Sequence, residues 1–182
     1  VNWTNFATGL PLADSYRIAI GVSPDDNDVV YLLYGRDDLD EDRSPFVGFY
    51  RSYDSGANFT LKCDTPNIIG STPTGIDSVG QYTWDLSIAV NPANNHEIHV
   101  GGINCWKSTD KGETWTITSY WEQNTPGYEY THADIHALEY HPANSNKLYC
   151  GSDGGVFLTT NHANNWTDIS EGLVITQFYR IG

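Results

Sequence analysis

An eight-residue pattern that recurs along the chain constrains its fold more than any other feature. Each copy, which we call a box turn, reads Ser or Thr, any residue, Asp, any residue, Gly, any two residues and an aromatic residue. The copies span 52–59, 108–115 and, in a degraded form, 159–166. A pattern that returns along a sequence indicates repeated structural units. The residues expected to hold these turns are Ser52, Asp54, Gly56, Phe59, Ser108, Asp110, Gly112, Trp115, Asn161 and Trp166.

A second repeated stretch lies ahead of each box turn. Residues 18–24, 86–92 and 136–142 end in Pro, which is followed by Asp or Asn residues and then by an apolar run. Each unit therefore reads as four short strands joined by a tight turn, a loop and a box turn. With 13% aromatic and 18% charged residues, the composition also suits half-buried strands. The sequence predicts an all-β fold.

The residues of the box turn have structural roles. A carboxylate at the start of a tight turn accepts backbone N–H groups, the Gly supplies a positive φ, and the aromatic side chain packs on the sheet. Asp54 and Asp110 are therefore expected to support the turn rather than to do chemistry. In the third copy Ala163 replaces the Gly, and a left-handed backbone there would be strained.

These motifs resemble the Asp-box, or bacterial neuraminidase repeat, propellers, a group that includes sialidases, sortilin-like domains and xyloglucanases. Residues 132–182 are most similar to repeats in large secreted bacterial surface proteins. The resemblance implies a β-propeller of four-stranded antiparallel blades in a secreted or cell-surface protein. The motif positions place about three blades at 15–61, 84–117 and 134–169.

Three blades are too few to close a ring, because closed propellers have about 4 to 8 blades. Residues 2–4 repeat the close of a box turn, and residues 177–182 repeat the opening strand of a unit. We therefore expect residues 1–182 to be part of one larger propeller. The remaining blades of the same protein would then pack against this chain as its partners.

Charge and composition limit the classes of molecule that are expected to bind this chain. A formal net charge of -14 makes nucleic acid a poor partner. The sequence holds no apolar run of about 18 residues, so no membrane span is predicted. The acidic run at 37–42 would bind Ca²⁺ or another divalent cation, or remain solvated. Cys105 and Cys150 align with apolar positions of the other units and are expected in the core.

Function is expected on one face of the propeller. The long, irregular segments 35–45, 62–83 and 117–131 all connect strands on the face opposite the box turns. Variable loops on a rigid scaffold usually carry binding and catalytic residues. The candidate site residues described next are expected on the same face.

One candidate is a run of alternating polar residues. In a strand, the spacing of two puts His132, Asp134 and His136 on the same side, which suits a metal site or an acid–base network. His136 stands where the other units have Ile18 and Leu86, so it needs a polar partner, and Asp134 is the nearest. A purely structural His–Asp pair is the alternative.

Asp153, in the stretch Ser-Asp-Gly-Gly, is the candidate catalytic carboxylate. Its setting is similar to that of a catalytic Asp in xyloglucanases, with the spacing one residue shorter. Paired glycines let a ligand approach the backbone, although the same Asp could simply cap a turn.

Loop aromatic residues are the third group of candidates. They would stack on sugar rings, anchor a protein partner, or pack the loops themselves. The candidates for ligand binding are Trp84, Trp121, Tyr128 and Tyr130, with Tyr82 beside them.

Two functions follow from these features. The first is a non-catalytic module that binds polysaccharide or a surface protein. The second is glycoside hydrolysis, in which Asp153 and a carboxylate from another blade would stand about 5 to 10 Å apart. A sialidase is disfavoured, because that family needs an arginine cluster and Arg17 recurs as Arg180 within the repeat.

Overall fold

The computed structural model describes residues 7–11, 17–36 and 44–175, and these residues form twelve strands in three sheets. Among them, no helix is long and apolar enough to cross a membrane. The first sheet contains β1 (Arg17–Ser23), β2 (Asp26–Gly35), β3 (Phe46–Ser52) and β4 (Thr60–Cys63). The second contains β5 (Ser87–Val90), β6 (Ile98–Gly101), β7 (Cys105–Ser108) and β8 (Thr116–Ser119). The third contains β9 (Ile135–His141), β10 (Asn144–Ser152), β11 (Gly155–Thr159) and β12 (Thr167–Asp168).

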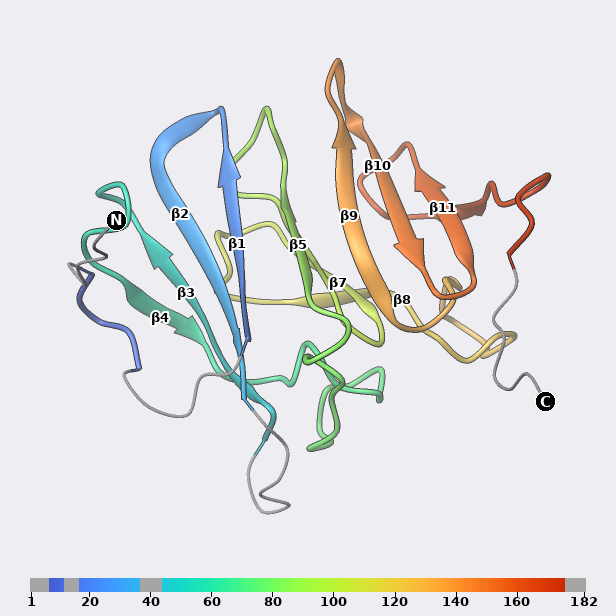
Figure 1. Cartoon of the computed structure of the whole chain (residues 1–182), viewed down its shortest axis with the longest axis horizontal. Helices are drawn as coiled ribbons and strands as arrows, with labels where there is room; N and C mark the ends of the chain where they lie inside the picture. Colours follow the sequence, from blue (N-terminus) through green and yellow to red (C-terminus); the bar gives the residue numbers. More distant parts are fainter. Residues whose placement is uncertain (1–6, 12–16, 37–43, 176–182) are drawn as a thin grey trace, which may run out of the picture.

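Each sheet is an antiparallel meander in which the strands lie in chain order. The three sheets stand side by side like the blades of a propeller, and their first strands β1, β5 and β9 are neighbours (Figure 1). The all-β prediction and the four-stranded units are confirmed. The acidic run at 37–42 and residues 2–4 and 177–182 lie outside the described residues.

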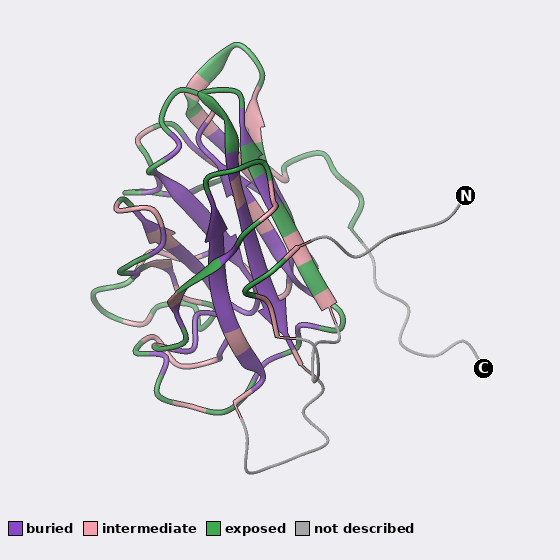
Figure 2. Ribbon diagram, turned by 90° about the vertical axis from the view of Figure 1, so that its left-hand side faces the viewer, coloured by how far each residue is buried: buried purple, intermediate pink, exposed green. Residues whose placement is uncertain are grey.

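Among the described residues, two buried clusters lie between the sheets, and a third (Leu32, Tyr34, Tyr50 and Phe59) lies on the first sheet. One buried cluster joins the first and second sheets and includes Tyr31, Phe49 and Trp115. Phe49 stacks on Tyr31 at 5.5 Å and meets Trp115 edge-on at 4.9 Å. A second cluster joins the second and third sheets and contains Cys105 and Cys150, which are buried as expected. Figure 2 shows buried residues through the interior of the stack and exposed residues along its edges and turns.

The box turns have the expected hydrogen bonds. In the first, Asp54 Oδ1 accepts the backbone N–H of Asn58 at 2.8 Å, and Ser52 Oγ accepts that of Gly56 at 3.0 Å. Hydrogen bonds from Asn58 lower the pKa of Asp54 to about 2, as is typical of a carboxylate that accepts several donors. Gly56 has a φ of 88°, a conformation that favours glycine.

The third box turn keeps this shape without a glycine. Asn161 Oδ1 accepts the backbone N–H of Asn165 at 3.1 Å, and Thr159 Oγ1 accepts that of Ala163 at 3.0 Å. His162 and Ala163 have φ values of 59° and 57°. Both residues therefore hold a left-handed backbone that costs about 1 to 2 kcal/mol each without glycine. The strain expected at Ala163 is present.

The segments that connect the strands lie on two opposite faces of the three sheets. The box turns and the first turn of each sheet lie on one, which we call the short-turn face (Figure 1). The other, which we call the long-loop face, carries the segments 64–86 and 120–134 and the turn between β10 and β11. The candidate site residues lie on the long-loop face.

Candidate functional site

His136 and Asp153 meet on the long-loop face. His136 is the second residue of β9, and Asp153 lies in the turn between β10 and β11. His136 Nε2 lies 2.6 Å from Asp153 Oδ1, and its Nδ1 lies 3.2 Å from the Trp84 carbonyl oxygen. Both ring nitrogens therefore face acceptors, which favours the imidazolium. The hydrogen bond to Asp153 raises the pKa of His136. Both side chains remain partly exposed, at 46% and 38%.

The expected alternation of His132, Asp134 and His136 along one side of a strand is wrong. β9 begins only at Ile135, whose N–H bonds to the Gly102 carbonyl at 2.9 Å, and Asp134 has a φ of 63°. A left-handed residue turns the chain, so the period of two does not extend back to His132. The partner of His136 is Asp153 rather than Asp134.

Asp134 and His132 have partners of their own. Asp134 Oδ1 accepts a hydrogen bond from Gln81 Nε2 at 3.1 Å. The His132 ring lies against Gly154, where a Cβ atom would stand 2.1 Å from the ring. Gly154 therefore makes room for His132 next to Asp153. Among the described residues, no group of three or more His, Cys, Asp or Glu side chains is arranged to hold a metal ion.

Asp85 is a site residue that the sequence reasoning missed. Its side chain is fully buried, and its carboxyl oxygens have no hydrogen-bond partner on another described residue. Burial, followed by the negative charge of Asp134, raises the pKa of Asp85 to about 7. A signal was present: aligned on the prolines, Asp85 takes the place of Ile135, a core residue of the third sheet.

Trp84 presents its indole to solvent next to these groups. Its side chain is 71% exposed, although large aromatic side chains are usually buried. The Trp84 N–H donates to the Gln81 carbonyl at 2.7 Å, so a tight turn fixes the backbone that carries the ring. Arg17 Nη1 holds the same segment by donating to the Thr83 carbonyl at 2.8 Å. Tyr82, by contrast, is buried against Gly35 and packs the loop.

The other aromatic candidates pack the loops. Trp121 Nε1 donates to the Ser71 carbonyl at 3.1 Å, and Trp121 and Tyr128 both contact Tyr120. This group ties the segment 120–134 to the segment 64–86. Tyr130 meets Phe157 edge-on at 5.9 Å and belongs with the core. In the described part of the chain, no hydrogen bond or ring contact joins this group to His136 or Asp153.

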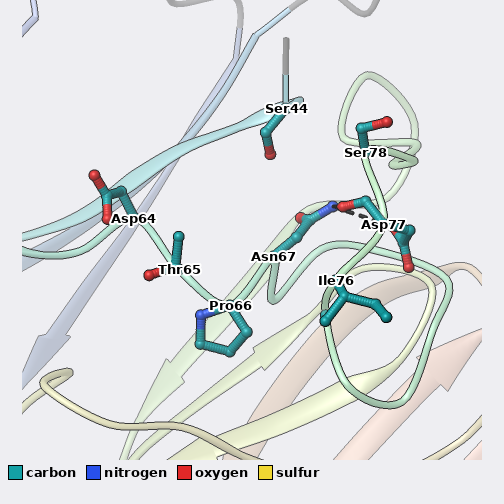
Figure 3. Close-up of a pocket in the computed structure, with 9 residues that line it drawn as sticks. Ser44, Asp64, Thr65, Pro66, Asn67, Ile76, Asp77 and Ser78 are labelled. Carbon is teal, nitrogen blue, oxygen red and sulfur yellow. Dashed lines mark hydrogen bonds between the residues drawn. The ribbon is translucent and has the colours of Figure 1, made fainter. Parts of the chain in front are cut away.

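Two of the hollows formed by described residues lie on the long-loop face. A cleft of about 610 Å³ with a mixed polar and apolar lining, shown in Figure 3, is bounded by the segment 64–67, Gly75 to Ser78 and Ser44. Its wall is fixed by Asp77, whose carboxylate accepts the backbone N–H groups of Thr72 at 2.6 Å and Val79 at 3.0 Å. A second hollow of about 270 Å³ is mainly apolar and borders His136 itself. Its lining includes Ala137, Gly151, Ser152, Gly155, Val156, Leu173 and Ile175.

Comparison with known proteins supports the fold. No family model and no curated protein sequence matches the chain. A xyloglucanase of family GH74 from Xanthomonas campestris superposes with a TM-score of 0.56 at 15% identity, over 84% of this chain and 23% of its own. A GH74 enzyme from Niastella koreensis gives 0.53 at 21% identity, over 84% and 22%. YCF48 bound to a D1 peptide gives 0.51 at 12% identity, over 87% and 42%.

The chain thus spans under a quarter of the GH74 chains and under half of YCF48. At these identities the likeness shows the arrangement of blades and nothing about activity. The three meander sheets of this chain are blades of a β-propeller.

Proposed function

We propose that this chain is part of a secreted or cell-surface propeller of the Asp-box type, and that it binds glycan through Trp84 and the polar groups around His136. The exposed indole of Trp84 carries the proposal. An aromatic ring on a fixed turn offers a sugar ring a flat apolar surface, and its two side-chain torsions keep the entropic cost of binding low.

The polar neighbours of Trp84 supply directional contacts. His136, Asp153 and Asp134 present donors and acceptors whose positions are fixed by hydrogen bonds at 2.6 and 3.1 Å. A few preplaced polar groups around an apolar surface are typical of small-ligand sites. Sugar hydroxyls both donate and accept, so they match this mixture of groups. The apolar hollow beside His136 extends the surface available to a second ring.

Hydrolysis of a polysaccharide is the second candidate, and one observation favours it. Burial, followed by the charge of Asp153, raises the pKa of Asp134, whereas Asp153 is paired with His136. A carboxyl group with a raised pKa beside a second carboxylate is a known acid and base arrangement. A xyloglucanase has a similar fold, so β-glucans are the first substrates to test.

A binding experiment separates these functions. The natural full-length protein is titrated calorimetrically with a panel of soluble β-glucans and with amino-sugar oligomers. Trp84→Ala should weaken binding about 5- to 150-fold, given about 1 to 3 kcal/mol for a lost stacking contact. The control is Tyr53→Ala, which removes a 52% exposed aromatic from the short-turn face and should leave binding unchanged. Equal affinity of Trp84→Ala and the parent would refute the proposal.

Hydrolysis is tested on the same panel by the release of reducing ends. Turnover that disappears in Asp153→Asn, with binding retained, would establish the enzyme and displace the binding module. Binding without turnover would leave the module as the function. A peptide ligand is the remaining outcome, since YCF48, which has a similar fold, has been solved with a bound peptide.

A further inference from the structure

We infer that the glycan bound at this site carries protonated amino groups, as a deacetylated amino-sugar oligomer does. The inference rests on the proposed function and names its ligand class. Its basis is an imbalance of charge around Trp84. The carboxyl groups of Asp85, Asp134 and Asp153 gather there. Of the cationic side chains nearby, His136 and Arg17 are hydrogen-bonded within the protein.

The positive charges are used within the protein. His136 is hydrogen-bonded to Asp153, so these two charges form one pair. Arg17 Nη1 donates to the carbonyls of Tyr82 and Thr83 at 3.3 and 2.8 Å. Its hydrogen bonds therefore hold the Trp84 segment in place.

Among the described residues, Asp134 has no cationic hydrogen-bond partner, and the charges of His132 and His136 act on it only from farther away. Its hydrogen-bond partner is the neutral amide of Gln81. Asp85 adds a second carboxyl that is fully buried and has no hydrogen-bond partner on another described residue. The negative charge of Asp134 opposes the ionisation of Asp85, and that of Asp153 opposes the ionisation of Asp134. A cation brought by a ligand would relieve this repulsion, which favours binding of a charged amine over a neutral hydroxyl.

One turn holds the two groups that a single sugar ring would contact, the indole of Trp84 and the carboxylate of Asp134. The backbone of Gln81 holds Trp84 and Asp85 through hydrogen bonds to their N–H groups at 2.7 and 3.1 Å, while its side chain holds Asp134. One turn therefore fixes the stacking surface and the carboxylate together. An ammonium group beside an indole also gains from the negative face of the ring.

Anionic glycans are excluded by the same charges. The whole chain carries a formal charge of -14, and the site adds carboxylates to that field. A metal ion as the missing cation is not supported in the described part of the chain, where three-ligand groups are absent. An organic ammonium needs one carboxylate and a surface, and both are present.

Calorimetric titration of the natural full-length protein at about pH 6 tests the inference, since amino sugars are then charged. Three oligomers of equal length are compared: β-linked glucosamine, its N-acetylated form and β-linked glucose. The glucosamine oligomer should bind at least about tenfold more tightly, the ratio for one charge-assisted hydrogen bond. Asp134→Asn should remove this preference, so that within this variant the glucosamine and glucose oligomers bind with similar affinity. Asp77→Asn, which changes a carboxylate of the cleft in Figure 3, should leave the preference unchanged.

The outcomes separate the two proposals. Equal affinities for the three oligomers would overturn the amine preference while leaving glycan binding in place. Absence of binding to any oligomer would overturn both. Glucosamine binding that survives Trp84→Ala would also overturn the inference, because the acidic surface alone would then account for it.

Discussion

His136 Nε2 lies 2.6 Å from Asp153 Oδ1, a contact between the start of β9 and the turn from β10 to β11. The carboxylate stabilises the imidazolium, which is why the pKa of His136 is raised. Asp153→Asn should therefore lower this pKa, which NMR titration of the ring protons can measure. The ring signals of His141, at the far end of β9, serve as the internal reference in both proteins.

The same pair makes stability depend on pH. A histidine whose pKa is higher in the folded state stabilises the fold below its unfolded value of about 6.5, and this stabilisation is lost as pH rises through the folded value. Urea unfolding of the parent should show that the free energy of unfolding falls on the alkaline side. In Asp153→Asn this fall should be smaller. Parallel curves for the two proteins would contradict the pairing.

Asp85 should make the fold less stable as pH rises. Its pKa is about 7 in the folded state against 3.8 in the unfolded state, so the folded state holds the proton more tightly. Stability should fall by on the order of 3 kcal/mol between about pH 4 and pH 7. Asp85→Leu should remove this slope and raise stability at neutral pH, as the aligned Ile135 suggests. Asp85→Asn should remove the slope without the stability that a buried leucine adds. An unchanged slope in both variants would show that Asp85 does not cause it.

The fold could be predicted because its signals are local. The box turns depend on hydrogen bonds between residues two to four apart, such as Asp54 with Asn58, so the pattern alone identifies them. The strands follow from alternation and from the turns that bound them.

The site could be predicted only in part, because its contacts join distant segments. His136 and Asp153 were both singled out as departures from the repeat, but their contact depends on the pairing of β9 with β10. The expected link to Asp134 failed because one left-handed residue ended the alternation. Asp85 escaped notice because its signal, alignment with the core residue Ile135, emerges only when the units are compared residue by residue.

Glu97 should hold the second and third sheets together. Its carboxylate accepts hydrogen bonds from His99 Nε2 at 3.1 Å, His162 Nδ1 at 2.9 Å and the Tyr140 hydroxyl at 3.0 Å. Burial opposes its ionisation, but the hydrogen bonds from His99 and His162 outweigh burial and lower its pKa to about 2. Glu97→Gln should therefore cost about 2 to 3 kcal/mol at neutral pH, as measured by urea unfolding.

The sign of the pH effect is opposite to that of Asp85. A depressed pKa gives stability that is present above the unfolded value near 4.5 and is lost as pH falls toward 2. Glu97→Gln should remove this acid-side loss. Glu139→Gln, an exposed glutamate on β9, serves as the control and should change stability by less than about 0.5 kcal/mol. Equal losses in the two variants would show that the network does not join the sheets.

The glycines of the first two box turns should differ in their tolerance of a methyl group. Gly56 and Gly112 have nearly the same backbone, with φ of 88° and 86°, so alanine adds about 1 to 2 kcal/mol of strain at either. A Cβ on Gly56 would lie 3.7 Å from its nearest neighbour, in ordinary contact, whereas one on Gly112 would lie 2.4 Å from the ring of Phe49. Gly112→Ala should therefore cost about 1 to 3 kcal/mol more than Gly56→Ala.

The third box turn explains why this difference arises between sheets. Cys105 aligns with Phe49, and it shares a core cluster with Ala163, which stands at the glycine position. The smaller cysteine leaves room for the alanine methyl that Phe49 denies to Gly112. In a Phe49→Cys background, Gly112→Ala should therefore cost no more than Gly56→Ala, as measured by a double-mutant cycle from urea unfolding. An excess cost that persists in that background would show that Phe49 is not its cause.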